Sequence, residues 1–200
     1  LSLSAAPTSL ASGRVEGLND PDVDLVVTFG DADTASVLLN DGNGIFTVSA
    51  TLAAGDDPQS AALADFDGDG RQDLVIASRG TDALTFFTQT DPATFVAGAT
   101  INSGGRGPQS VVAADFDLDG DVDVVVTNTD SSPGSSIAVH LNRGNATFIA
   151  PVTFAGGVTP TALQAADLDG DGALDLAIIN ASTDTLTLLL NSTETTAGTI

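Results

Sequence analysis

The stretch ADFDGDGRQDLVIAS, residues 64–78, joins an acidic loop to an apolar segment. Asp65, Asp67, Asp69 and Asp73 surround Gly70, and the run LVIAS follows the last aspartate directly. Carboxylates this close repel one another unless a cation lies between them. A short apolar run bounded by turn residues is typical of a β-strand. We therefore expect a cation-binding loop that leads into a strand.

The same pattern occurs twice more along the chain. DFDLDGDVDVVVTN covers residues 115–128 and DLDGDGALDLAIIN covers residues 167–180, so the three copies start 50 and 52 residues apart. A proline lies seven residues before each copy, at Pro58, Pro108 and Pro160. Repetition on both sides of the loop predicts a repeat protein rather than scattered acidity.

A weaker copy near the start brings the number of repeats to four. NDPDVDLVVTFG, residues 19–30, matches the other copies through Asp24 and the apolar run that follows it. A chain of 200 residues that is 42% hydrophobic is long and apolar enough to form one domain with its own core. We expect a single domain over residues 1–200 with repeats at about 7–57, 58–107, 108–159 and 160–200.

Each repeat is expected to contain four short strands. In the second repeat the predicted strands are SAALAD, LVIAS, ALTFFTQ and TFVAGATI, starting at residues 60, 74, 83 and 94. Turn sequences such as NDGNG at 40–44 and NRGN at 142–145 separate the third strand from the fourth. No segment has a sustained helical period. The pattern predicts an all-β fold of four-stranded antiparallel blades, arranged as a β-propeller or a propeller-like array.

The acidic loops have the ligand spacing of a calcium site. Side chains at positions 1, 3, 5 and 9 of DxDxDGxxD converge on one point, the glycine at position 6 permits the bend, and position 7 contributes its backbone carbonyl. Hard oxygen ligands in this number favour Ca²⁺ over Mg²⁺, which requires a stricter octahedron. We expect about three calcium ions. The predicted ligands are Asp65, Asp67, Asp69, Arg71 and Asp73; Asp115, Asp117, Asp119, Asp121 and Asp123; and Asp167, Asp169, Asp171, Ala173 and Asp175.

The equivalent loop of the first repeat is degenerate. Glu16, Leu18 and Asp20 occupy the ligand positions before Asp24, and Pro21 takes the place of the glycine. One ligand and the flexible bend are both lost. We expect this loop to bind calcium very weakly or not at all.

The chain resembles the FG-GAP/VCBS repeats of integrin α-subunit propellers and of many secreted bacterial proteins. Besides the aspartate loops, the similarity lies in SVLLNDGNGIFTVSATL at 36–52 and IAVHLNRGNATFIAPVTF at 137–154, and it extends from about residue 7 to 191. The resemblance implies a β-propeller with calcium bound between the strands of each blade, in an extracellular or cell-surface protein. Propellers of this family usually have about seven blades, more than four repeats supply.

Composition excludes several classes of partner. Twenty-seven acidic residues against five arginines give a net charge of −22, which repels nucleic acid and anionic membranes. There is no cysteine, and no apolar run approaches the roughly 18 residues of a membrane span. The start at Leu1, without Met or a signal pattern, indicates a removed leader or a fragment. Acceptor sequons for N-glycosylation begin at Asn145, Asn180 and Asn191.

Catalysis is not expected from this sequence. Paired aspartates can hydrolyse glycosides, but a single active site does not need three copies of one loop. His140 is the only histidine, it lies in a predicted strand, and Cys, Lys, Tyr and Trp are all absent. Sugar binding needs aromatic platforms, and the only aromatic residues are phenylalanines, expected in the core at positions that include Phe46, Phe95, Phe148 and Phe154.

The two ends of the chain suggest a role in assembly. The fourth repeat finishes with STETTAGTI and lacks a clear last strand, whereas the chain begins with the alternating LSLSA. Residues 1–6 would either complete the last blade of their own chain or be exchanged into a neighbouring copy, which propagates into a filament. We hypothesise an extracellular, calcium-stabilised structural or adhesive module whose partners are calcium and other protein chains, including copies of itself. The alternative is a monomeric propeller for protein–protein binding, cut from a larger secreted or surface protein.

Overall fold

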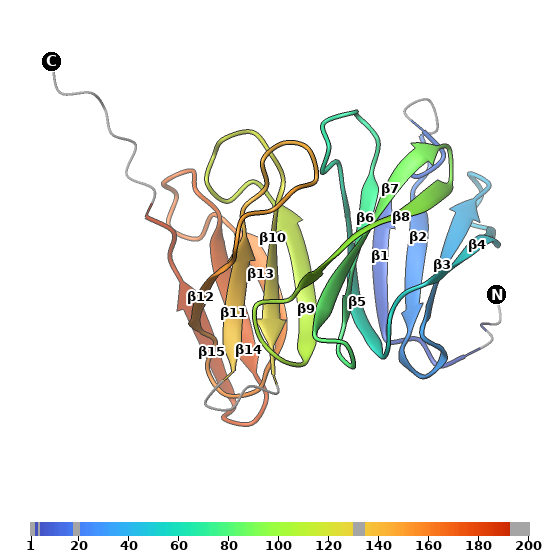
Figure 1. The fold of residues 1–200 in the computed structure, drawn as a ribbon. Helices are drawn as coiled ribbons and strands as arrows, with labels where there is room; N and C mark the ends of the chain where they lie inside the picture. Colours follow the sequence, from blue (N-terminus) through green and yellow to red (C-terminus); the bar gives the residue numbers. More distant parts are fainter. Residues whose placement is uncertain (1–2, 4, 18–20, 130–134, 193–200) are drawn as a thin grey trace, which may run out of the picture.

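The computed structural model describes residues 3, 5–17, 21–129 and 135–192. It has four antiparallel sheets, or blades, arranged side by side as in a β-propeller (Figure 1). The only helical element in the described residues is the single 3-10 turn Gly30–Ala32. The predicted all-β blade architecture is thus confirmed.

Each blade is built from strands in sequence order, with the first strand innermost. The described part of blade 4 has three strands, and residues 193–200, where its last strand was in question, lie outside the description. Blade 1 contains β1 (Ser9–Gly13), β2 (Asp24–Phe29), β3 (Thr34–Asn40) and β4 (Phe46–Ala53); blade 2 contains β5 (Pro58–Ala64), β6 (Asp73–Ser78), β7 (Ala83–Asp91) and β8 (Thr94–Asn102); blade 3 contains β9 (Pro108–Ala114), β10 (Asp123–Asn128), β11 (Ser136–His140) and β12 (Val152–Ala155); blade 4 contains β13 (Pro160–Ala166), β14 (Asp175–Asn180) and β15 (Thr185–Leu189).

The core lies between the blades. In β6 and β10 every residue is buried, because each second strand packs one face on the preceding blade and the other on the following blade. Strands covered on both faces read as continuous apolar runs, which is why LVIAS and VVVTN show no polar alternation. Three apolar clusters of this kind join blade 1 to 2, blade 2 to 3 and blade 3 to 4.

The row of blades is open. The innermost strands contact one another in the order β1, β5, β9 and β13, and within the described residues β1 has no extended contact with β13. Figure 1 shows blades 1 and 4 at the two ends of the row.

The start of the chain lies on blade 1. Leu3 and Ala5 pack against Val27, Phe29 and Leu38, on the face of blade 1 that points away from blade 2. Leu3 and Ala5 thus lie partly buried at the end of the row opposite blade 4. The suggestion that residues 1–6 form the last strand of blade 4, in their own chain or in a neighbouring copy, stays a prediction.

The phenylalanines mostly follow the core prediction. Phe46, Phe95 and Phe148 pack against three different apolar clusters. Phe154 differs, since it lies on the outermost strand β12 and is 47% exposed.

Candidate metal centres

Three acidic loops connect the first strand to the second in blades 2, 3 and 4. Each makes its bend at the glycine of position 6, with φ of 85° at Gly70, 96° at Gly120 and 92° at Gly172. Side chains with a Cβ rarely adopt such angles, so the glycines are needed for the backbone and not for space. The bend turns the aspartates before and after it toward one another.

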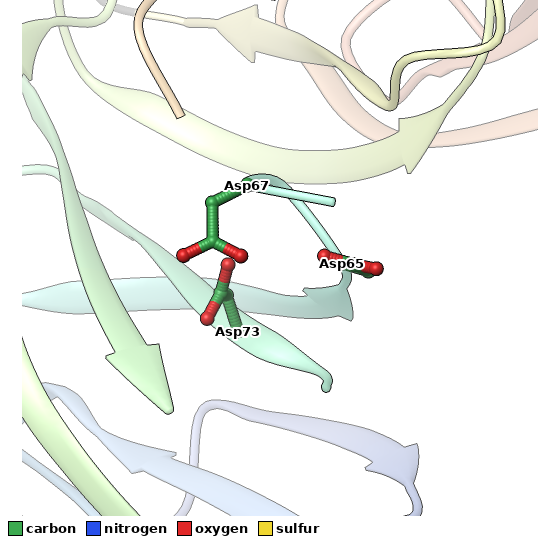
Figure 2. A group of neighbouring side chains, drawn as sticks. All are labelled: Asp65, Asp67 and Asp73. Atoms are coloured by element: carbon green, nitrogen blue, oxygen red, sulfur yellow. The ribbon is translucent and has the colours of Figure 1, made fainter. Parts of the chain in front are cut away.

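Positions 1, 3 and 9 of each loop form a carboxylate triad. In each triad one oxygen from every residue lies within 4.8 Å of the others. Figure 2 shows the first triad, with the carboxylates of Asp67 and Asp73 pointing toward each other and Asp65 beside them. The triads are Asp65, Asp67 and Asp73; Asp115, Asp117 and Asp123; and Asp167, Asp169 and Asp175.

The aspartate at position 9 is the buried member of each triad and begins the second strand of its blade. In blade 2, Asp73 accepts hydrogen bonds from the backbone N–H of Phe66 at 3.2 Å and of Gln89 at 2.8 Å. Asp123 and Asp175 accept the equivalent pairs of bonds. Position 9 therefore ties the loop to the end of the third strand, a structural role that the ligand spacing does not reveal.

The aspartates at position 5 do not join the triads. Asp69 accepts from the backbone N–H of Arg71 at 2.9 Å and forms an ion pair with its guanidinium. Asp119 and Asp171 likewise accept from the backbone N–H of position 7, at 2.9 and 2.8 Å. These short-range bonds hold the position-5 carboxylates against the loop backbone in the structure, so their predicted part as ligands stays a prediction. So does the part of the carbonyl groups of Arg71, Asp121 and Ala173.

The electrostatics of the first two triads favour a cation. Burial, together with the nearby charges of Asp67 and Asp69, raises the pKa of Asp73 to about 6 in spite of its hydrogen bonds. Burial also raises the pKa of Asp123, and burial with the charges of Asp119 and Asp115 raises that of Asp117. A negative charge is costly at these three positions unless a proton or a metal ion compensates it. In the third triad, by contrast, the backbone hydrogen bonds from Asn191 and Leu168 lower the pKa of Asp175.

The donor set fits a hard divalent ion. Asp115 Oδ1 is buried and has no hydrogen-bond partner among the described residues, so this triad contains an oxygen with its ligand capacity unused. The triads offer carboxylate oxygens alone, without the nitrogen or sulfur ligands that zinc prefers. Oxygen-only sites on an open loop suit Ca²⁺, which accepts irregular geometry. With such an ion bound, positions 1, 3 and 9 would hold it.

The first repeat keeps the aspartate of position 9, and the described residues around it form no carboxylate triad. Asp24 is fully buried and accepts from the backbone N–H of Val15 at 2.9 Å and of Asn40 at 3.0 Å. Residues 18–20 lie outside the described part of the chain, so the prediction of an empty loop stays open. The bonds of Asp24 show that position 9 has its structural role in the blade that lacks the acidic loop.

The three sequons differ in their surroundings. Asn145 is exposed. Asn180 is 1% exposed and its amide donates to Thr187 Oγ1, while the amide of Asn191 donates to the carbonyl of Phe116. Since glycosylation needs a free, accessible amide nitrogen, the structure leaves Asn145 as the sequon open to modification.

A family model described as the FG-GAP-like repeat matches the chain at residues 18–76, 65–126 and 115–178. Together these ranges cover well over half of the sequence, including all three triads. The chain belongs to the FG-GAP-like repeat family. This agrees with the resemblance drawn from the aspartate loops and identifies the molecule as a propeller domain of that family.

Solved structures share the fold at low sequence identity. A candidate 6-phosphogluconolactonase from Bacteroides uniformis matches with a TM-score of 0.57 and 16% identity, over 89% of this chain and 52% of its own. BBS1N, solved in complex with ARL6DN and soaked with lead, matches with a TM-score of 0.57 and 12% identity, over 95% and 58%. A protein from Lactobacillus plantarum matches with a TM-score of 0.55 and 14% identity, over 92% and 54%.

The FG-GAP chain thus spans a little more than half the length of these structures. No curated protein matches its sequence. At such identities the structural matches show the fold alone.

Proposed function

We propose that this FG-GAP chain is a calcium-stabilised structural or adhesive module of an extracellular or cell-surface protein. The observation that carries the proposal is the repetition of one carboxylate triad in blades 2, 3 and 4, each anchored by a buried aspartate at the start of the second strand. An ion held there would join the loop to that strand and relieve the repulsion among the carboxylates. Calcium would then act as a cross-link within each of these three blades.

The family and the supply of calcium outside cells support the proposed extracellular or cell-surface location. FG-GAP repeats are typical of extracellular and surface proteins. Extracellular modules bind calcium with dissociation constants of about 10⁻⁴ to 10⁻³ M, which suits exposed loops of this kind. In the described residues no helix is long and apolar enough to cross a membrane.

A non-catalytic role is part of the proposal. Identical triads in three blades serve stabilisation better than chemistry at one centre. His140 is 1% exposed within β11, and burial lowers the pKa of its imidazole, so it is neutral and shielded from any substrate.

Assembly with other protein chains is the finer part of the proposal. A groove of about 550 Å³ lies beside β15 and is lined by apolar residues that include Val152, Phe154, Leu188 and Leu190. A fourth strand of blade 4 would pair with β15 next to this groove, and residues 1–6 of a neighbouring copy are one candidate for that strand. The alternative function, a monomeric propeller that binds other proteins, predicts no association between copies.

Counting bound calcium tests the proposal directly. Equilibrium dialysis of the chain against millimolar Ca²⁺, followed by elemental analysis, should give three ions for each chain. Excess Mg²⁺ should displace little of it, because magnesium gives up its water reluctantly. Absence of bound calcium at millimolar concentration would contradict the proposal.

A further inference from the structure

The outer face of blade 4 is an uncovered copy of the surface through which the blades pack on one another. Ile179, Leu186 and Leu188 are 53%, 62% and 52% exposed. They share one face, because Ile179 pairs with Leu186 across the sheet and Leu188 lies two residues further along the same strand. The residues equivalent to Ile179 in blades 1, 2 and 3 are fully covered by the next blade: Thr28, Ala77 and Thr127 are all 0% exposed.

Blade 1 carries the complementary half of this contact. Val27, Phe29 and Leu38 lie on the face that, in blades 2 to 4, packs against the preceding blade. Blade 1 has no preceding blade in the described residues, and Leu3 and Ala5 cover the face instead. The two ends of the row are thus the two halves of one interface that the chain already forms three times.

A hydrogen bond repeats at each internal blade contact. A residue near the end of the third strand donates its backbone N–H to the position-9 aspartate, and its side-chain amide donates to a carbonyl of the preceding blade. Asn142 reaches the carbonyl of Phe66 at 2.8 Å, and Asn191 reaches that of Phe116 at 2.8 Å. In blade 2, Gln89 donates to the carbonyl of Val15 in the same way.

The end blades carry the two halves of this hydrogen bond as well. Asn40 of blade 1 donates its backbone N–H to Asp24, and its amide donates to the carbonyl of Val23 at 3.3 Å, as Asn142 does to that of Val122. Leu168 of blade 4 occupies the place of Phe66 and Phe116, since its N–H donates to Asp175 as theirs donate to Asp73 and Asp123. An amide at one end of the row and a carbonyl at the other therefore match.

We propose that a second copy of this chain docks head to tail, with the outer face of blade 4 on one copy packed against the Val27, Phe29 and Leu38 face of blade 1 on the other. Leu3 and Ala5 move aside, and the amide of Asn40 donates to the carbonyl of Leu168. The contact reproduces the interface between blades, so both surfaces are already shaped for it. It goes beyond the calcium proposal and does not depend on it.

The same contact made at both ends joins two copies into a closed ring of eight blades. One copy covers 52 to 58% of the chains of the matched structures, so two copies have about the length of one such chain. If the curvature does not close after two copies, the contact propagates into a filament.

Deletion of residues 1–6 separates face docking from strand exchange. Face docking predicts tighter association, by at least about tenfold in dissociation constant, because the deletion uncovers blade 1. Strand exchange predicts the opposite, since the donor strand is lost. Sedimentation in saturating Ca²⁺ at several protein concentrations measures the change. Weaker association after deletion, or a monomer at every concentration with and without residues 1–6, would overturn the proposal.

Substitutions on the exposed face provide a matched comparison. Ile179→Lys with Leu186→Lys should abolish association, whereas Val96→Lys on β8, a position that is 51% exposed in an internal blade, should leave it unchanged. Circular dichroism and thermal unfolding confirm that these surface variants fold. Equal association of both variants would count against the blade 4 face.

A disulfide test locates the contact by residue. The chain has no cysteine, so Asn40→Cys with Leu168→Cys introduces the only two thiols. These positions lie in blades at opposite ends of the row, so within one copy they are too far apart to bond (Figure 1). Mild oxidation should give covalently linked copies, and the control pair Asn40→Cys with Val96→Cys should give few. Equal yields from the two pairs would contradict the proposed register.

Discussion

At the scale of single residues, each triad contains carboxylates with two different tasks. The aspartates at positions 1 and 3 lie on the loop, whereas the aspartate at position 9 is buried and accepts two backbone hydrogen bonds. Loss of a loop carboxylate should therefore affect calcium, and loss of the buried one should affect the fold as well.

The second loop allows a matched test of the ligand assignment. Asp117→Asn removes a triad carboxylate and should lower the calcium count from three ions to two. Asp121→Asn changes the side chain at position 7, whose expected ligand is the backbone carbonyl, and should leave three ions bound. Dialysis with elemental analysis measures both variants. An unchanged count for Asp117→Asn would remove this loop from the calcium sites.

The raised pKa of Asp73, about 6, predicts how pH affects the calcium-free chain. A carboxyl group whose pKa rises from 3.8 on folding binds its proton more tightly in the folded state, so folding is favoured at low pH. The contribution of Asp73 to the free energy of unfolding should fall as pH rises from about 4 to 6. Denaturant unfolding in chelator at several pH values measures this slope, and Asp73→Asn should flatten it. A contribution that rises over this range would have the wrong sign.

Calcium should reverse this dependence, because the ion and the proton compete for Asp73. Below pH 6 the apparent calcium affinity of the loop that contains Asp73 should weaken by about tenfold for each pH unit. Titrations at pH 5 and pH 7 provide the comparison.

The contacts that the sequence did not reveal join residues that lie far apart along the chain. Ligand spacing and the glycine bend are local patterns. They predicted the acidic loops and the approach of the side chains of positions 1, 3 and 9 to one another. The amide contact from Asn142 to Phe66 joins residues 76 apart, and the loop around Asn142 reads only as a turn. Position 5 also differs from the predicted ligand set, because Asp69 accepts a hydrogen bond from the backbone N–H of Arg71 and lies outside the triad.

At the scale of elements, the buried aspartate that begins each second strand holds the preceding loop and the end of the third strand in place through its hydrogen bonds. Asp24 has this role without a carboxylate triad among the described residues, so it separates the structural task from the metal task. Asp24→Ala leaves the N–H groups of Val15 and Asn40 without their acceptor and should lower the free energy of unfolding by roughly 2 to 4 kcal/mol.

This loss should be the same with calcium and with chelator. Asp31→Ala, at an exposed position on the turn Gly30–Ala32, serves as the control and should change stability by less than about 0.5 kcal/mol. Denaturant unfolding compares the two variants. A loss for Asp24→Ala that appears only in calcium would place a metal site in the first loop after all.

The strands themselves were largely predictable. The second repeat has strands at 58–64, 73–78, 83–91 and 94–102, close to the predicted segments, because apolar runs alternate there with turn residues. The position of Leu3 and Ala5 was not predictable. An alternating segment fits either the edge of a sheet or its face, and only the packing against Phe29 and Leu38 decides between them.

At the scale of the whole molecule, both the net charge and the open row of blades lower the stability of the fold. A net charge of −22 opposes compaction, and three calcium ions would reduce it to about −16. An open row also lacks the last contact of a closed ring, so each blade depends on its contacts with its neighbours. Bound calcium would strengthen the acidic loops within blades 2 to 4, and docking of a second copy would supply the missing contact.

Thermal unfolding in millimolar Ca²⁺ and in excess chelator tests the central claim most directly. Each ion present at about 100 times its dissociation constant adds roughly 2.7 kcal/mol to the free energy of unfolding. Three sites should therefore raise the Tm by on the order of 20 °C over the chelated chain. Deletion of residues 1–6 should leave this difference in place. Equal Tm values in calcium and in chelator would contradict a fold stabilised by calcium.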